Sequence, residues 1–533
     1  MKYKVDDIDT IRQNIYSSVL DAVSGNSKIE DDDYVFSIEE LDYEGPESID
    51  PEKEKEAILT GGTVYRPLRG TVRLYDKKTG QLISEERKRI AAVPYITPRG
   101  TFILNGVEYG VINQMRLRPG VYTRLTNDGE YEALINVAKG VGHRYVFDPT
   151  SGVFYLKSGQ ARVPLYPFLR ALGISDQQLQ KVWGSEILKI NQEQADNTAI
   201  RRAALAIFGR QIKAATDEDL VKRIRELYGT LEVDPNVNAI TLNRPSKTLD
   251  SETVLRITQK LLQGARGEET IDDRNHIAFL KAIGPEDLLR EAIQKNVNRL
   301  RNYYNRVRAR RNVRYFPTGI FDDAIRESIY GSGLGNALQE INPLEILDNR
   351  YRTTRMGEGG ITNVWQVTDD NRYNHPSFVG FIDPIVTPEG LNVGVDVRFG
   401  TGVRRDEHGN IYSTFVDAKT NKKVELTPQQ LFNKVVTFES ALAENTPLVP
   451  AIINNQHILV PRKEIDYIVS DVEKAYSPLS NLIPMKQNSY PQRVSMGARM
   501  ITQAVPLVDP EAPFVQNLST VHGKSYEKLY GEQ

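Results

Sequence analysis

The 533-residue sequence contains no cysteine, which excludes a disulfide, a cysteine-ligated zinc site and a thiol nucleophile. It also lacks an apolar run of the roughly eighteen residues that a membrane helix needs. Its start, MKYKVDDIDTIRQ, lacks the basic and then apolar layout of a secretory signal. Hydrophobic residues make up 40% of the chain and charged residues 26%, as in globular proteins, and the length predicts two to four domains. We expect a multidomain protein that stays where it is made, without contact with a membrane.

Charge is distributed unevenly, although the formal net charge is only −2. The segment from Asp31 to Glu56 is densely acidic, whereas Ala292 to Phe321, here called the basic segment, has no acidic residue. Arginines interleaved with tyrosines are typical of surfaces that contact nucleic acid. A solvated helix face is the alternative, and charge does not distinguish DNA from an acidic partner subunit. The basic segment carries Lys295, Arg299, Arg301, Arg306, Arg308, Arg310, Arg311 and Arg314, with Tyr303, Tyr304 and Tyr315.

Hydrophobic periodicity predicts an α+β chain. Strand-like alternation occurs in the first 120 residues, in GTVRLYD and GTFILNG, and strands with hairpin turns at HGN and TNK are expected between residues 394 and 471. Apolar residues at helical spacing predict four helices between these regions. The expected helices are NTAIRRAALAIFGRQIKAA, EDLVKRIRELYG, SETVLRITQKLLQGA and one long helix, EDLLREAIQKNVNRLRNYYNRVRAR.

The segment from Asn342 to Gly394 carries the strongest functional signal. It reads NPLEILDNRYRTTRMGEGG and, after a short insert, HPSFVGFIDPIVTPEGLNVG. Arg350, Arg352 and Arg355 lie within six residues and precede glycine-rich turns. Arginine binds phosphate with two parallel donors, and glycine lets a backbone approach a ligand closely. The composition indicates a polyanion-contacting surface, with an ordinary surface loop as the alternative.

These motifs resemble the rifampicin-pocket and fork region of the β subunit of multisubunit, DNA-dependent RNA polymerases. The matching patterns are NPL…R.R…G.GG and HP…G…PI.TPEG.N.G. Two further blocks resemble the same family in the same order. VPYITPRGTFILNGVEYGVINQMRLRPGV, residues 93–121, is similar to the N-terminal GTF.ING and RPGV-type signature, and NLIPMKQNSYPQRVSMGARMITQAVP, residues 481–506, to the later MGA and QAVP stretch. Three blocks in the family's order argue against chance agreement.

The resemblance implies the names of the parts of a multidomain α+β chain. Residues 1–122, with the acidic leader, and 269–335, with the basic helix, would form a protrusion. Residues 123–268 would form a lobe, and 336–400 the fork with rifampicin-pocket-like loops. Residues 401–480 would be an external strand-rich insert, and 481–533 the start of the active-centre wall.

The resemblance also implies the role and the partners. Parts of a full β subunit that follow QAVP have no counterpart here, so we expect the N-terminal fragment of a naturally split β subunit, of the kind found in giant bacteriophages. Its partners would be a C-terminal β fragment, β′-like N- and C-terminal fragments, an accessory promoter-recognition subunit, template DNA, RNA and nucleoside triphosphates. It would act in an infected bacterial cell, in the cytoplasm or a phage-made compartment, or be packaged in the virion.

Catalysis in this family needs Mg²⁺ held by an NADFDGD-type motif on the β′ side. This sequence has no such motif. We therefore expect Mg²⁺ on a β′-like partner chain, assign no catalytic residue and no metal ligand here, and expect no synthesis by the isolated chain.

The expected contribution is the positioning of substrate and nucleic acid. Arg493, Met496, Met500 and Gln503 fall on one face of a predicted helix, beside Arg499. By resemblance, Arg493 contacts the phosphates of the incoming nucleotide, with Met496, Glu389 and Asn392 in the same neighbourhood. Core packing is the alternative for Met496 and Met500. The residues expected to contact nucleic acid are Arg308, Arg310, Arg311, Arg350, Arg352, Arg355, Arg499 and Gln503.

The sequence departs from the family in two places. Arg499 replaces the asparagine of MGAN, and uncharged residues from Gln487 to Tyr490 replace acidic ones. In the antibiotic pocket Arg352 matches, but Asn336, Gln339, Asn349 and Thr354 stand where sensitive enzymes have glutamine, aspartate, histidine and serine. Losing a carboxylate and an imidazole leaves polar groups of a bound ligand unmatched, which predicts rifampicin resistance.

Two other functions fit part of the sequence. A non-catalytic nucleic-acid-binding or virion-structural protein with a degenerate β-like fold would not need Glu389, Arg493 or the PEG turn for packing. A single-chain polymerase would need the missing aspartate motif.

Overall fold

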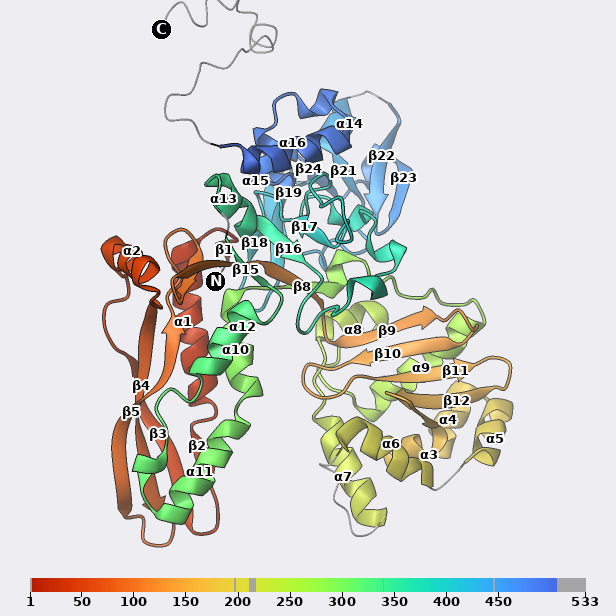
Figure 1. Cartoon of the computed structure of the whole chain (residues 1–533). Helices are drawn as coiled ribbons and strands as arrows, with labels where there is room; N and C mark the ends of the chain where they lie inside the picture. Colours follow the sequence, from red (N-terminus) through yellow and green to blue (C-terminus); the bar gives the residue numbers. More distant parts are fainter. Residues whose placement is uncertain (1, 196–197, 210–216, 339, 444–445, 506–533) are drawn as a thin grey trace, which may run out of the picture.

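Two limbs and an upper module make up the structure (Figure 1). The computed structural model describes residues 2–195, 198–209, 217–338, 340–443 and 446–505. The two limbs lie next to each other below the upper module, and small sheets lie where the three units meet (Figure 1). This arrangement confirms the predicted multidomain α+β fold. Within the described ranges, no helix combines the length and the apolar character needed to cross a membrane.

The first limb packs helices against a four-stranded antiparallel sheet of order β2-β3-β4-β5. One hydrophobic core joins the sheet to α1 and to helices from much later in the chain. In α1, Ile11, Ile15 and Val19 are buried at helical spacing, and Asp7 caps the first turn by accepting a hydrogen bond from Thr10 N (3.2 Å). The elements are α1 (Ile8–Ser24), β2 (Lys28–Glu30), β3 (Tyr34–Tyr43), α2 (Pro51–Thr60), β4 (Tyr65–Asp76), β5 (Leu82–Pro94), α10 (Pro285–Lys295), α11 (Asn298–Arg310) and α12 (Asp322–Tyr330).

The single long helix predicted over residues 286–310 is wrong, because the chain forms two helices there. α10 ends at Lys295 and α11 begins at Asn298. At the break, Asn296 Nδ2 donates to Ala292 O (2.8 Å). A side chain that bonds a backbone carbonyl competes with the helical hydrogen bond, and this local competition ends α10.

The second limb holds an antiparallel sheet of order β13-β12-β11-β10-β9 against helices. Its core is separate from that of the first limb and includes Trp183, which stacks on Phe154 with ring centroids 4.5 Å apart. The predicted helices at 218–229 and 251–265 are confirmed. The helix predicted before them is confirmed over residues 198–208, and its residues 210–215 lie outside the described residues. The elements are β9 (Gly120–Leu125), β10 (Tyr131–Asn136), β11 (His143–Asp148), β12 (Val153–Ser158), β13 (Ala161–Pro164), α3 (Tyr166–Ala171), α4 (Asp176–Trp183), α5 (Ser185–Glu193), α6 (Thr198–Phe208), α7 (Asp217–Gly229), α8 (Pro235–Thr241) and α9 (Ser251–Ala265).

The upper module contains the largest sheet, of order β1-β18-β19-β24-β21-β22-β23 with β20 paired to β19. The predicted hairpins at HGN and TNK are confirmed as the β18–β19 and β19–β20 pairs. The N-terminal strand joins this distant sheet, since Tyr3 pairs with Arg405. The elements are β1 (Tyr3–Lys4), α13 (Leu344–Tyr351), β18 (Arg404–Arg405), β19 (Ile411–Asp417), β20 (Lys423–Leu426), β21 (Val436–Phe438), α14 (Glu439–Ala443), β22 (Leu448–Ile453), β23 (Gln456–Pro461), β24 (Tyr467–Val469), α15 (Pro478–Leu482) and α16 (Pro491–Gln503).

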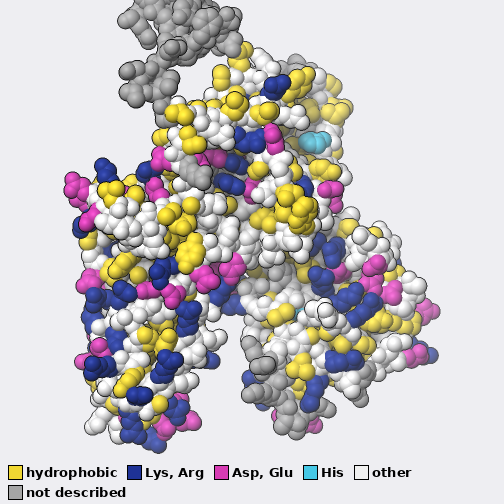
Figure 2. All heavy atoms as spheres, viewed as in Figure 1, with side chains coloured by type: hydrophobic (Ala, Val, Ile, Leu, Met, Phe, Trp, Pro, Cys, Tyr) yellow, Lys and Arg dark blue, Asp and Glu magenta, His cyan; other side chains and the backbone are white. Residues whose placement is uncertain are grey.

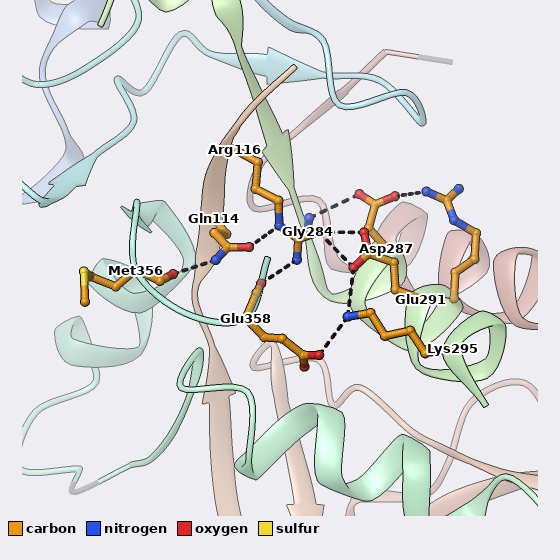
Figure 3. Close-up of polar contacts among 9 residues, drawn as sticks. Gln114, Arg116, Gly284, Asp287, Glu291, Lys295, Met356 and Glu358 are labelled. Atoms are coloured by element: carbon orange, nitrogen blue, oxygen red, sulfur yellow. Dashed lines mark hydrogen bonds and ion pairs between the residues drawn. The ribbon is translucent and has the colours of Figure 1, made fainter. Parts of the chain in front are cut away.

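Two small sheets connect the units. Their orders are β14-β8-β16-β17 and β15-β7-β6. β8 is central because its side chains bond segments of the first limb and of the upper module. Figure 3 shows Gln114 donating to Met356 O (2.6 Å), and Arg116 bonding both Glu291 of α10 (2.7 Å) and Glu358 O (3.0 Å). The strands are β6 (Thr101–Leu104), β7 (Val107–Val111), β8 (Asn113–Leu117), β14 (Leu280–Ile283), β15 (Gly335–Ala337), β16 (Arg352–Thr354) and β17 (Asp396–Arg398).

We predict that His143 makes the second limb sensitive to acid. Burial lowers the pKa of His143 to about 4, and Nε2 lies 3.0 Å from Tyr228 Oη. An unfolded histidine takes up a proton below about pH 6.5, so the unfolded state binds more protons than the folded state between pH 6.5 and 4. Stability should therefore fall by about 3 kcal/mol as the pH falls through this window. Urea unfolding followed by the fluorescence of buried Trp183 measures it.

The control for this prediction is the exposed His457 on β23. The substitution His143→Gln removes the titrating group, so its unfolding free energy should depend less on pH between 6.5 and 4 than that of the parent chain or of His457→Gln. Equal pH dependence in the parent and in His143→Gln would contradict the assignment.

Candidate functional site

A polar cavity of about 150 Å³ lies in the upper module between α13, α15, α16 and the strands β15, β16 and β17. It gathers predicted site residues that are far apart in the sequence: Asn336, Asn349, Arg352, Arg499 and Gln503. Gln339, predicted for the same pocket, lies outside the described residues. The remaining lining residues are Ala337, Leu338, Glu345, Asp348, Val386, Arg398, Leu479 and Thr502.

Asn342 fixes the position of α13 relative to α16. Its Oδ1 accepts from Leu344 N (3.0 Å) at the start of α13. Its Nδ2 donates to Ala504 O (2.9 Å) and Ile501 O (3.3 Å), which lie at the end of α16 where backbone carbonyls lack helical partners. One asparagine thus joins two helix ends that are far apart in sequence, a role that the NPL motif did not reveal.

Three arginines of the cavity wall are each held by a carboxylate. Arg352 Nη2 lies 2.7 Å from Asp396 Oδ2, and Arg499 pairs with Glu389. Arg398 bonds Asp348 with two parallel donors, Nε at 3.0 Å and Nη2 at 2.6 Å. These pairs fix the orientation of each guanidinium group.

Burial and neighbouring charge shift two pKa values in the wall. Burial disfavours the charged form of Arg398, but the adjacent carboxylate of Asp348 outweighs it and raises the pKa. Burial, followed by repulsion from Asp348, raises the pKa of Glu345. The wall therefore combines fixed cations with a carboxyl group that is easier to protonate than usual.

Arg398, Asp348 and Asp396 belong to this site although the sequence did not predict them there. The sequence feature that could have indicated them is the alternation of charged and apolar residues in VDVRF, where Asp396 and Arg398 are both buried. A buried charge in a strand needs a partner, and that partner could not be located from the sequence.

Helix α16 presents the predicted face to solvent. Arg493 and Gln503 are exposed, as are Met496 (43%) and Met500 (67%), so the core-packing alternative for the two methionines is wrong. Arg493 forms no ion pair or hydrogen bond with any residue that the structure describes. The opposite face buries Val494, Ser495 and Ala498.

The 387–394 loop lies against α16 and carries the exposed Glu389 and Asn392. Ser495 Oγ donates to Thr387 O (3.3 Å), and the Arg499–Glu389 pair makes a second connection. Thr387 Oγ1 accepts from Gly394 N (2.8 Å) and closes the loop. The loop that carries Glu389 and Asn392 is thus attached to α16 through Ser495 and Arg499.

The three clustered arginines point to different places. Arg352 lines the cavity, whereas Arg350 Nε donates to Arg99 O (3.0 Å). Arg355 is in the interior, where it donates to Asn275 Oδ1 (3.2 Å) and Asn371 Oδ1 (3.1 Å). Burial lowers the pKa of Arg355 to about 10.

Thr354 lies apart from the cavity. Its side chain is buried, and Oγ1 accepts a hydrogen bond from Met356 N (3.1 Å). It stabilises the turn after β16.

Helix α11 of the basic segment lies toward the far end of the first limb, away from the cavity (Figure 1), whereas Lys295 pairs with Glu358 after β16 (2.9 Å). Arg308 pairs with Asp31 (3.0 Å) and Asp33 (3.6 Å) of the acidic leader. Arg310 lies over the Tyr315 ring (4.6 Å) and Arg311 over Tyr34 (6.0 Å). Figure 2 shows Lys and Arg side chains interspersed with acidic ones at this end of the limb. The predicted nucleic-acid residues thus divide between two places, and part of the basic charge is neutralised.

No candidate metal centre occurs in the described part of the chain. Three or more histidine, aspartate or glutamate side chains do not come together there as a metal ion would require. The acidic leader instead contributes carboxylates to arginine and lysine, including the Glu30–Lys77 pair at 3.0 Å.

Two family models match the chain. The model "RNA polymerase Rpb2, domain 2" matches residues 118–279, which cover the second limb. The model "RNA polymerase Rpb2, domain 3" matches residues 336–398, which include α13, β16, the 387–394 loop and β17 of the cavity wall.

Curated relatives carry the name DNA-directed RNA polymerase subunit beta. The protein from Prochlorococcus marinus (strain MIT 9301) is 26% identical over 502 residues, and that from Parasynechococcus marenigrum (strain WH8102) is 27% identical over 505 residues. In both cases 86% of this chain aligns with 45% of the relative, so the chain spans about half the length of the curated relatives it matches. The sequence is thus similar to the N-terminal part of bacterial RNA polymerase β subunits and includes segments that match domains 2 and 3 of Rpb2.

Proposed function

We propose that this chain is the N-terminal β fragment of a multisubunit DNA-directed RNA polymerase and that it forms part of the DNA cleft and of the nucleotide site. The observation that carries the proposal is the exposed face of α16, on which Arg493 lies without an ion-pair partner among the described residues. The segments around it are those that resemble polymerase β subunits.

In this proposal Arg493 stabilises the negative charge of a nucleoside triphosphate. An exposed arginine free of internal bonds can give two parallel donors to phosphate oxygens, and such donors lower the barrier when charge develops during phosphoryl transfer. Met496, which is exposed, would provide an adaptable apolar contact for the sugar or base, and the exposed Glu389 and Asn392 would be further substrate contacts.

Phosphoryl transfer of this type uses Mg²⁺, which neutralises phosphate charge. The carboxylates of the described residues do not fit a magnesium site, because no three of them gather. We therefore derive no step through the ion from this chain and propose that a β′-like partner binds it.

In this proposal fewer arginines contact nucleic acid than the sequence predicted. Arg355 is buried, and Arg350, Arg352 and Arg499 already hold internal partners. Arg310 and Arg311 at the far end of the first limb remain exposed and would contact backbone phosphates. Gln503, exposed at the end of α16, would contact nucleic acid in the cleft.

We further propose a split polymerase of the giant-bacteriophage type, acting in an infected bacterial cell or from the virion. Its other chains would be a C-terminal β fragment, β′-like N- and C-terminal fragments and an accessory promoter-recognition subunit.

Affinity purification of the tagged chain from its native context tests the proposal. We expect co-purification with a C-terminal β fragment and with β′-like chains that carry the aspartate motif, together with template-dependent ribonucleotide incorporation. The isolated chain should incorporate none. Capsid components without RNA synthesis would instead support a virion-structural or nucleic-acid-binding role.

We predict that the assembled polymerase resists rifampicin. Asn336 and Asn349 line the cavity, where sensitive enzymes present glutamine and histidine. An unmatched buried polar group costs a ligand about 1–3 kcal/mol. RNA synthesis should therefore continue at rifampicin concentrations that stop a bacterial enzyme assayed in parallel, and inhibition at those concentrations would overturn the prediction.

We predict that Arg493→Ala weakens nucleotide use by the assembled enzyme. Loss of a charged donor to the triphosphate should lower kcat/KM for nucleoside triphosphates about 100-fold, while DNA binding stays unchanged. Gln492→Ala, at the neighbouring exposed position of α16, is the matched control and should leave kcat/KM unaltered. The assignment fails if Arg493→Ala keeps the parental kcat/KM or if both variants lose it equally.

A further inference from the structure

A groove of about 670 Å³ lies on the first limb between the loop after β3, helix α2 and the start of β4. The loop and the first part of the helix belong to the acidic leader, to which the proposed function gives no role. The groove is lined by the carboxylates of Glu44, Asp50 and Glu56 as well as by apolar side chains. The apolar lining residues are Pro46, Ile49, Ala57, Val64, Tyr65 and Pro67.

Helix α2 beside the groove is held by few contacts. None of its ten residues is buried, and Ala57 is only partly buried against a small separate core. Ile58 and Leu59 are 43% and 86% exposed. A helix of this length is marginal by itself and gains most of its stability from packing an apolar face. Apolar groups placed in the groove would supply packing that α2 lacks.

The charge around the groove is negative. Residues 44–56 contain six acidic and two basic side chains, a net charge of −4. Arg69 balances Glu44 (2.6 Å), and Arg66 donates to Gly45 O (3.2 Å). The exposed side chains that form no ion pair among the described residues are the carboxylates of Glu47, Asp50, Glu52 and Glu56 and the ammonium groups of Lys53 and Lys55. The unbalanced charge therefore favours a cationic ligand and repels an anionic one.

We propose that this groove docks a segment of a partner protein in which large apolar side chains are flanked by lysine or arginine. The apolar side chains pack against Tyr65, Ile49 and Ala57, and the cations face Glu56 and the other unpaired carboxylates. A nucleic acid would bring its phosphates against those carboxylates, and a purely cationic ligand would leave the apolar lining uncovered. The proposal does not rest on the polymerase role, because it concerns binding by this chain.

Fluorescence anisotropy of a labelled eight-residue peptide of alternating leucine and lysine, titrated with the full chain, tests the proposal. We expect saturable binding. Two matched peptides, in which glutamate replaces every lysine or serine replaces every leucine, should bind at least about tenfold more weakly, because each lacks one of the two complementary features. A short single-stranded RNA should not compete with the leucine–lysine peptide.

The substitution Glu56→Lys places the peptide in the groove. It reverses a charge of the lining and puts a cation toward the C-terminal end of α2, where a cation favours the helix, so weaker binding would not reflect loss of the helix. Repulsion should weaken binding of the leucine–lysine peptide about tenfold. Glu186→Lys, at an exposed position of α5 in the second limb, is the matched control and should bind like the parent.

Hydrogen exchange provides a second measurement on the same samples. The leucine–lysine peptide should slow exchange of the α2 amides in the parent chain and leave the α5 amides unchanged. Absence of saturable binding, equal affinity for the three peptides, equal affinity in the parent and Glu56→Lys, or equal weakening by Glu56→Lys and Glu186→Lys overturns the proposal. Competition by RNA would overturn it too, because it would assign the groove to nucleic acid.

Discussion

The hydrogen bonds made by the polar side chains of β8, and by Arg118 directly after it, determine how the units of this protein sit against one another. Asn113 Nδ2 donates to Arg350 O (2.8 Å), which places α13 and β16 beside the central sheet. Gln114 and Arg116 hold the glycine turn after β16, and Arg116 also bonds α10 of the first limb. Arg118 bonds Asp234 of the second limb (3.2 Å) and Asn410 of the upper module (2.7 Å). Since buried donors need fixed acceptors, the geometry of the cavity follows from these contacts.

The arginines of the upper module fall into two groups: buried ones that carboxylates hold in place, and an exposed one without such a partner. Arg352 and Arg398 are fixed by carboxylates, so they contribute shape and a permanent field inside the cavity. Arg493 lies in solvent on α16, where no described residue restrains its side chain. Arg499 is intermediate, because it lines the cavity and also holds the 387–394 loop through Glu389. Arg499 therefore links the cavity wall to the position of that loop.

The local sequence pattern was sufficient to predict those helices and hairpins that are determined by residues close together in the sequence. Periodicity gave α9 with its observed bounds, and turn residues gave the β18–β19 and β19–β20 hairpins. It failed at Asn296, where one side-chain hydrogen bond ends a helix that periodicity would continue. Arg308 pairs with Asp31, 277 positions away in the sequence, and no local sequence pattern predicts such a distant ion pair. Family resemblance, not local chemistry, indicated that Asn336, Asn349 and Arg352 belong together, and it could not show that Arg355 is buried.

The second limb enters and leaves the rest of the protein at one point. The chain runs from β8 into the limb and returns through β14, and these two strands pair with each other, Leu117 opposite Leu280. Arg118 N also donates to Phe279 O (2.8 Å), so residues 118–279 form a closed excursion whose two ends are about 5 Å apart. A domain inserted in this way between two paired strands can change in length and sequence without altering the path of β8 and β14. A two-residue turn could join β8 to β14 directly. The second limb could therefore be replaced by another domain, in evolution or in design, while the pairing of these two strands is kept.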